Sequence, residues 1–249
     1  MQEPAMTMQA ERKPAASAAA WGPLDILKAI GFVVAGSILG FIPVGIVLLV
    51  IAGDHPEDHP TALTIEVGSS AVLQIMMFLA VWRFAVRKYR QPWSALGLRA
   101  PVRGSWWLPI PLVIGAYSIM IAYFGALSAF GINPDTDLPD QVYDNIGPIV
   151  ALVALSLCFA PVMEETFFRG FVFGGLRGRW GVPLSALASG LLFGIVHTLN
   201  PGAFYIVPPI AAVGALFAFG YAYSDSIFPT MAAHFLFNLI SVTLGIASS

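Results

Sequence analysis

Five ionisable side chains interrupt long apolar stretches in the second half of this 249-residue chain. They are Glu164, Glu165, Arg169, His197 and His234. A carboxylate can act as a base toward water, while imidazole and amide groups can hold a developing negative charge. Because burying a charge in apolar surroundings is costly, each of the five is a candidate for catalysis or for a structural ion pair.

Two adjacent glutamates stand in the segment P-V-M-E-E-T-F-F-R-G, residues 161–170. Glu165 and Arg169 are spaced i,i+4, so they share a helix face and can pair. Glu164 is rotated by about 100° from Glu165 and faces elsewhere. We therefore expect Glu165 to be neutralised and Glu164 to be free to activate water, although both could merely neutralise arginines. Pro161 removes one helical hydrogen bond and is expected to kink the helix beside them.

Two further pairs repeat the one-turn spacing. Phe193 and His197 share one helix face, and His234 and Asn238 share another. A single histidine in a membrane helix often only bonds to a neighbouring helix. At about 1.5 Å per residue, however, Glu164, His197 and His234 lie at overlapping depths in their helices, so one shared site near the membrane midplane or its cytoplasmic side is feasible.

The elements that must position these groups are membrane helices. Apolar residues make up 57% of the chain and charged residues only 10%, which excludes an ordinary soluble domain. The apolar runs do not alternate as in an outer-membrane barrel, and several reach the roughly 20 residues that a spanning helix needs. The sequence thus predicts an all-α, polytopic transmembrane helix bundle of about seven spans. The expected spans are 24–52, 63–85, 106–130, 147–173, 182–199, 204–223 and 227–246.

Three regions follow from this pattern: a disordered tail (1–22), amino-terminal transmembrane helices (23–145) and a core with the candidate residues (146–249). Lys and Arg concentrate in the tail, between the second and third spans, and after the fourth. The positive-inside rule then predicts a cytoplasmic amino terminus. We expect an integral protein of the plasma (inner) membrane.

Several functions are disfavoured. The net charge of −2 provides no basic field for nucleic acid, and the single Cys158 excludes an internal disulfide and a multi-cysteine metal site. A serine or cysteine mechanism has little support, because no G-x-S-x-G segment occurs and Cys158 has no nearby histidine in its own segment. His55 and His59 favour a solvated acidic loop over a metal clip. In the earlier spans, the polar residues Glu66, Gln74 and Arg83 are near span ends or uncharged.

The three motifs together resemble a known family. E-E-x-x-x-R, F-x-x-x-H and H-x-x-x-N occur in this order on successive membrane helices, from about Ala151 to Asn238. The combination is similar to the CPBP family, the CAAX-protease and bacteriocin-processing (Abi) intramembrane proteases, which include the Rce1-type endopeptidases. On this resemblance residues 146–249 are the catalytic core.

The resemblance implies hydrolysis of a peptide bond in the membrane. Glu164 with His197 would activate water, Glu165 with Arg169 would hold the site together, and His234 with Asn238 would steady the oxyanion. Glu164, His197 and His234 also form the His₂Glu set of a catalytic zinc site. The family is commonly called metalloprotease, but Rce1-type members have been interpreted as metal-free. We favour a site with no tightly held metal, and zinc stays open as the alternative.

Alternatives stay open. A transporter could use buried Glu and His to relay protons, but such residues would form a chain across the bilayer. Some relatives are thought to be immunity proteins or scaffolds, so intact motifs need not mean that cleavage is used. The expected partners are the lipid bilayer and a membrane-associated or lipidated, CAAX-like peptide or protein. The physiological substrate and the oligomeric state do not follow from the sequence.

Overall fold

The computed structural model describes residues 19–53, 55, 58–134, 140–198 and 203–248. Most of the predicted disordered tail, residues 1–18, lies outside this range. Every regular element of the described residues is helical, which confirms the all-α prediction. The elements are α1 (Pro23–Ala52), α2 (Pro60–Ser69), α3 (Ala71–Val81), η2 (Trp82–Arg87), η3 (Trp93–Leu96), η4 (Val102–Trp107), α4 (Pro109–Ala129), α5 (Asp140–Asp144), α6 (Ile146–Val153), η5 (Ala154–Phe159), α7 (Ala160–Glu164), η6 (Glu165–Phe173), α8 (Gly174–Ile195), η7 (Val196–Thr198), η8 (Ala203–Tyr205), α9 (Val207–Ser224) and α10 (Phe228–Ser248).

Six helical stretches among the described residues are long and apolar enough to cross a membrane. One of them, Ile146–Thr198, has 53 residues, which is about twice the length needed for one crossing. Its backbone breaks at Gly181, where φ is 75° and ψ is 169°. Glycine adopts such angles readily, and other residues do not. The chain reverses at this break, so the long stretch supplies two spans. The count of about seven spans is confirmed.

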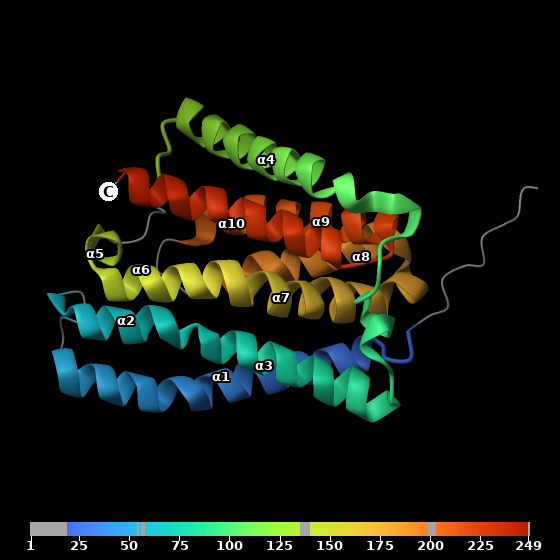
Figure 1. Cartoon of the computed structure of the whole chain (residues 1–249), viewed down its shortest axis with the longest axis horizontal. Coiled ribbons are helices and arrows are strands. Elements are labelled where there is room, and N and C mark those ends of the chain that lie inside the picture. The colour runs from blue at the N-terminus through green and yellow to red at the C-terminus, as the bar shows by residue number, and fades with distance from the viewer. Residues whose placement is uncertain (1–18, 54, 56–57, 135–139, 199–202, 249) are drawn as a thin grey trace, which may run out of the picture.

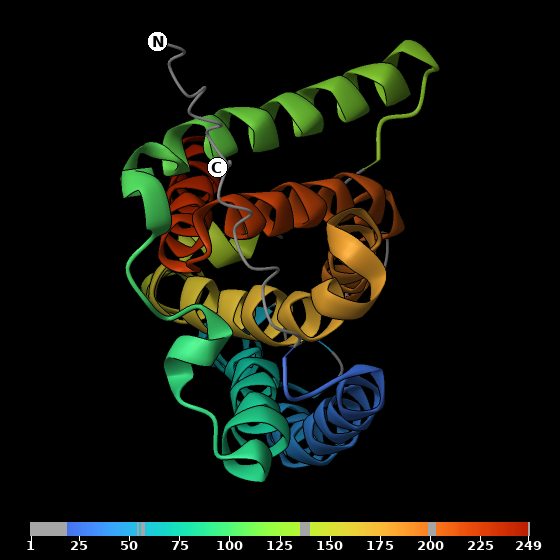
Figure 2. The same cartoon turned by 90° about the vertical axis from the view of Figure 1, so that its right-hand side faces the viewer.

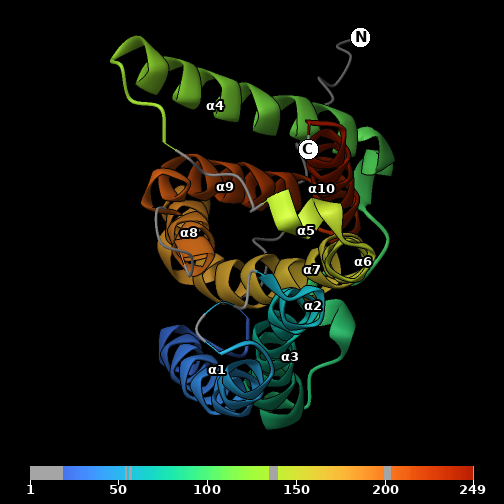
Figure 3. The same cartoon turned by 90° about the vertical axis from the view of Figure 1, so that its left-hand side faces the viewer.

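The helices form three layers (Figure 1). Views from the two ends show α6 to α10 in the middle layer, α4 on one side and α1 to α3 on the other (Figures 2 and 3). The amino-terminal helices pack directly on the core, since α2 contacts α6 and α3 contacts α7 and η6. The amino-terminal region therefore contributes to the surroundings of the glutamates.

Small residues bring α8 and α9 into close contact. A methyl group on Gly194 would lie 2.7 Å from the Val207 carbonyl oxygen, and one on Gly214 would lie 2.9 Å from the Cα of Gly190. Such spacing allows backbones to approach without intervening side chains. The packing fixes the end of α8, where His197 follows.

The helix that carries the glutamates changes its hydrogen-bond spacing. Between α6 and α8 it contains two π-helical segments, η5 and η6, separated by the short α7. Pro161 stands in α7, between the two π-helical segments, and has no N–H to donate; the kink expected from the sequence stays a prediction. Wide turns of this kind often occur at functional sites.

The basic residues gather at the end of the bundle where α1 begins and α3 ends. Lys88 pairs with Asp25, and Arg99 Nη2 lies 2.6 Å from Asp225 Oδ2. Arg177 Nη2 lies 3.1 Å from the other carboxylate oxygen of Asp225. These pairs connect loops from distant parts of the chain at one end.

Candidate active site

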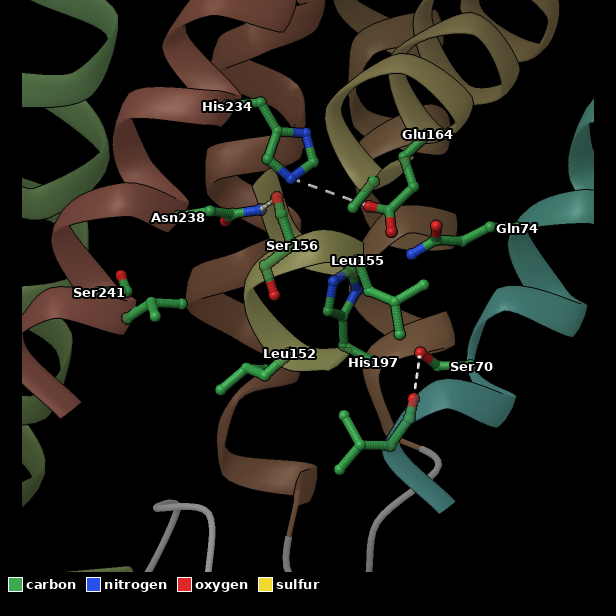
Figure 4. A pocket seen from close by; sticks show the side chains of 13 residues that line it. Ser70, Gln74, Leu152, Leu155, Ser156, Glu164, His197, His234, Asn238 and Ser241 are labelled. Carbon is green, nitrogen blue, oxygen red and sulfur yellow. Dashed lines mark hydrogen bonds and ion pairs between the residues drawn. The ribbon is translucent and has the colours of Figure 1, made fainter. Parts of the chain in front are cut away.

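A cavity of about 300 Å³ lies inside the bundle and receives polar side chains from both halves of the chain (Figure 4). Its wall is formed by α2, α3, α6, η5, α7, η7 and α10. The lining residues are Val67, Ser70, Gln74, Leu152, Leu155, Ser156, Ala160, Glu164, His197, His234, Asn238, Ser241 and Val242. Four of the six predicted site residues thus face one space, and Glu165 and Arg169 lie behind it.

Glu165 is the fixed carboxylate of the pair. Its Oε1 lies 3.0 Å from Arg169 Nη1, as the i,i+4 spacing predicts, and it accepts a hydrogen bond from His234 Nδ1 over 3.0 Å. Both Glu165 and Arg169 are fully buried. The hydrogen bond from His234 to Glu165 therefore connects α10 to η6 and sets the orientation of the His234 ring.

Arg169 is also enclosed by neighbours on two other helices. Its guanidinium carbon lies 4.4 Å from the ring centre of Phe193 and 5.3 Å from that of Phe217, and Nη2 donates to the Gly214 carbonyl oxygen over 3.3 Å. A planar cation suits such stacking. The carboxylate of Glu165, the two aromatic rings and the Gly214 carbonyl oxygen together compensate the buried charge of Arg169. We therefore interpret Arg169 as a structural residue of the site.

Glu164 is the free carboxylate of the pair. It is only 9% exposed, it lines the cavity, and its Oε2 has no hydrogen-bond partner among the described residues. The nearest charged partner is His234, whose Nε2 lies 3.9 Å from Oε2. Figure 4 shows the two side chains pointing toward each other from α7 and α10. A water molecule with two hydrogen bonds of about 2.8 Å, meeting at roughly a right angle, could bridge this gap.

His197 follows the end of α8 and reaches the cavity from a third helix. Its Nδ1 lies 2.7 Å from the Phe193 carbonyl oxygen, and its ring centre lies 4.7 Å from that of Phe193. Because a carbonyl only accepts, Nδ1 must carry the proton in this bond. In the neutral ring, Nε2 is then an acceptor. In the F-x-x-x-H motif, the backbone carbonyl group of Phe193 lies one turn before His197 and holds the histidine ring in place.

Asn238 lines the cavity but has a backbone partner. Its Nδ2 donates to the Ser156 carbonyl oxygen over 2.8 Å. That oxygen lacks its usual partners, because the Ala160 N–H bonds to Leu155 and Pro161, five residues on, has no N–H. Asn238 therefore stabilises the wide turn beside Glu164, and one of its two amide protons is used in doing so.

The three residues named as possible zinc ligands match zinc in type but not in arrangement. Glu164, His197 and His234 line one cavity, and each imidazole donates its Nδ1 proton to an oxygen, as metal-binding histidines usually do. Within the described ranges, however, no three His, Cys, Asp or Glu side chains stand close enough to share one ion. The residues do not fit a zinc ion as they are arranged.

The structure brings all six predicted residues to one region and adds four polar ones. Ser70, Gln74, Ser156 and Ser241 were not among the candidates, yet they line the same cavity. Gln74 is 7% exposed and lies on α3, outside the region that carries the motifs. The i,i+4 spacing of Ser70 and Gln74 in an apolar stretch was the signal that could have identified this polar face.

Comparisons with known proteins match part of this chain. Residues 146–240 match the family described as type II CAAX prenyl endopeptidase Rce1-like. A Bacillus subtilis (strain 168) protein named "Putative membrane peptidase YdiL" is 29% identical over 139 residues, 55% of this chain and 55% of its own. An uncharacterized protein of Mycoplasma capricolum is 33% identical over 101 residues, 40% of this chain and 29% of its own. The chain thus spans about half or less of the length of these relatives. No solved structure matches it closely enough to count as a relative.

Proposed function

The carboxyl-terminal core of this integral membrane protein belongs to the CPBP family of intramembrane proteases, and we propose that the chain hydrolyses a peptide bond within the membrane. The observation that carries the proposal is the state of Glu164. A buried carboxylate oxygen without a hydrogen-bond partner faces a cavity and an imidazole nitrogen 3.9 Å away. Buried polar atoms are nearly always paired, so an unpaired carboxylate oxygen that faces a cavity is available to bond a water molecule there.

The reaction needs one water molecule and one proton carrier. Glu164 takes a proton from the water as its oxygen attacks the carbonyl carbon, and the carbonyl electron pair moves onto oxygen. When the C–N bond breaks, the electron pair returns to form the new carboxyl group. Glu164 then gives the proton to the leaving nitrogen, and the products are one acid and one amine.

The remaining residues support this step. His234 faces the bridging water position through Nε2, and Glu165 with Arg169 holds that ring in place. His197 offers a second ring nitrogen at the cavity, consistent with its predicted part in activating water. No step is assigned to a metal ion.

The substrate class is a membrane-associated or lipidated peptide. Three arguments support it: the cavity lies inside a bundle of apolar helices, its polar groups suit a peptide bond, and the matching family is described by its action on prenylated CAAX sequences. A peptide attached to a lipid would reach such a cavity from the bilayer.

We further propose that the protein lies in the plasma (inner) membrane with a cytoplasmic amino terminus. The ion-paired basic cluster at the start of α1 and the end of α3 supports this orientation, since Lys and Arg favour the cytoplasmic side. The residues that line the cavity extend from Glu164 toward Ser70 and Ser241 (Figure 4).

The test compares new peptide termini in membrane fractions of cells expressing equal amounts of the wild type or Glu164→Gln. Mass spectrometry should find a set of termini that requires the wild type. Glu164→Gln keeps the shape and removes the base, so a fold defect is not expected. Identical termini in both samples would contradict proteolysis and favour a scaffold or immunity role.

A further inference from the structure

A substrate peptide that enters the cavity brings backbone N–H groups with it. The carbonyl group of the cleaved bond has to be free for attack, so the peptide beside it is not helical and its N–H groups lack their helical partners. Inside a membrane, an unpaired backbone N–H costs several kcal/mol. Acceptor oxygens that face the cavity would therefore stabilise a bound, unwound peptide.

Two buried acceptor oxygens of the cavity have no partner. Among the described lining residues, they are Oε2 of Glu164 and Oε1 of Gln74. The proposed reaction uses the oxygen of Glu164 to bind and activate water. It does not use the oxygen of Gln74, which is available to a ligand.

Gln74 is buried on α3, among the amino-terminal helices. It is 7% exposed, and Figure 4 shows its side chain extending toward Glu164, on the side opposite His234. Leaving a buried amide oxygen unpaired costs about 1–3 kcal/mol, a cost that an apolar side chain at this position would avoid. The amide oxygen is therefore suited to a hydrogen-bond donor that enters the cavity.

The two faces of α3 differ in the same sense. Leu73 and Met77 line a separate apolar cavity of about 320 Å³, together with residues of α1 and α8. Ser70 and Gln74, one turn apart, line the polar cavity. Ser70 Oγ already donates to the Val67 carbonyl oxygen over 2.9 Å. On the polar face of α3, the amide oxygen of Gln74 thus remains for a peptide.

We propose that Gln74 binds the substrate backbone, with Oε1 accepting a hydrogen bond from a peptide N–H close to the scissile bond. The inference rests on the proposed hydrolysis and specifies what the cavity recognises: an unwound peptide backbone. No covalent bond forms or breaks at Gln74. The residue lies outside the family match at residues 146–240, so the amino-terminal helices contribute to substrate binding.

The test uses the purified full-length protein in detergent. A detergent extract of host membrane proteins, treated with the wild type or Glu164→Gln, first locates a cleavage site by its new termini. Synthetic peptides that span this site then carry an ester oxygen in place of one backbone N–H at a time, except at the scissile bond. The ester removes one donor with little change in shape.

Values of kcat and KM are measured for each peptide with the wild type, Gln74→Met and Ser37→Ala. Ser37 is the matched control, because it is also buried with an unpartnered oxygen but lines the apolar cavity. Ser37→Ala should keep wild-type values. The thermal midpoint of Gln74→Met should equal or exceed that of the wild type, because methionine removes an unpaired buried amide.

We expect Gln74→Met to raise KM for the all-amide peptide about 3–10-fold, the effect of losing one hydrogen bond. The change in kcat should stay below about threefold, because the bond is present both before and during the reaction. One ester position should raise the KM of the wild type by a similar factor and leave the KM of Gln74→Met unchanged. Both changes remove the same hydrogen bond, so their effects should not add.

The outcomes separate the two proposals. If Gln74→Met keeps the wild-type KM, substrate binding by Gln74 is wrong and the proteolysis stands. The same conclusion follows if every ester position affects the wild type and Gln74→Met equally, since the raised KM would then reflect packing. If no new termini depend on Glu164, both the binding role and the proposed hydrolysis are wrong.

Discussion

His234 donates from Nδ1 to Oε1 of Glu165 over 3.0 Å, and this bond connects the last helix to the helix of the glutamates. The same oxygen pairs with Arg169. The other ring nitrogen, Nε2, faces the unpaired carboxylate of Glu164 at 3.9 Å. Two adjacent glutamates thus contact opposite sides of one imidazole, one with a structural role and one with a proposed chemical role.

The first prediction is that the two glutamates respond differently to the same substitution. Glu165→Gln leaves the buried Arg169 charge without its carboxylate, so we expect a loss of about 3–5 kcal/mol in the free energy of unfolding. Glu164→Gln removes no ion pair with Arg169 and should change the free energy of unfolding by less than about 1 kcal/mol. Denaturant titration in detergent micelles, followed by tryptophan fluorescence, measures both. Equal losses would show that Glu164 is a structural residue as well.

The second prediction concerns the hydrogen bond between Asn238 and the Ser156 carbonyl oxygen. Asn238→Ala leaves that oxygen unpaired and should lower the free energy of unfolding by about 1–3 kcal/mol. Pro161→Ala restores an N–H five residues after Ser156, the spacing that η5 uses. We therefore expect Asn238→Ala to cost at least about 1 kcal/mol less when Pro161→Ala is present.

A double-mutant cycle of unfolding free energies measures this coupling. Ser241→Ala, introduced in the same two backgrounds, serves as the control because Ser241 lines the cavity and its hydroxyl bonds to that of Tyr117. Coupling no larger than that of the control would mean that Asn238 does not compensate for Pro161.

The sequence predicted the helices and the six motif residues because both leave local signals. Apolar runs of spanning length define membrane helices, and Glu165 and Arg169 pair at a fixed helical spacing. The backbone break at Gly181 lies between two of the predicted spans, 147–173 and 182–199.

The position of Gln74 at the cavity was not predicted, because an uncharged amide in an early span belongs to no motif and its surroundings depend on which helix lies opposite. The partner of Asn238 was also hidden. It depends on the π-helical turn at η5, which frees a carbonyl that an ordinary helix would satisfy. Both features arise from packing between α3, η5 and α10, and not from spacing within one helix.

The third prediction is that the proposed hydrolysis does not need zinc. The three suitable ligands line one cavity, but no three acidic, histidine or cysteine side chains among the described residues are close enough to share an ion. We expect less than about 0.1 zinc per chain by mass spectrometry after purification without added metal, and unchanged cleavage after dialysis against a chelator. His197→Ala serves as the comparison. Stoichiometric zinc in the wild type that is lost in this variant would overturn the prediction.

The fourth prediction concerns orientation, which determines the side of the membrane toward which the cavity extends. Seven spans and a basic cytoplasmic end put a reporter fused after Ser249 outside and one fused after Arg90 inside. Paired fusions to alkaline phosphatase, which is active outside, and to a green fluorescent protein, which fluoresces inside, should give opposite signals at the two positions. A fusion after Arg179, beside the reversal at Gly181, should match the one after Arg90. A cytoplasmic signal at Ser249 would contradict the odd number of spans, and an outside signal at Arg90 would reverse the proposed orientation.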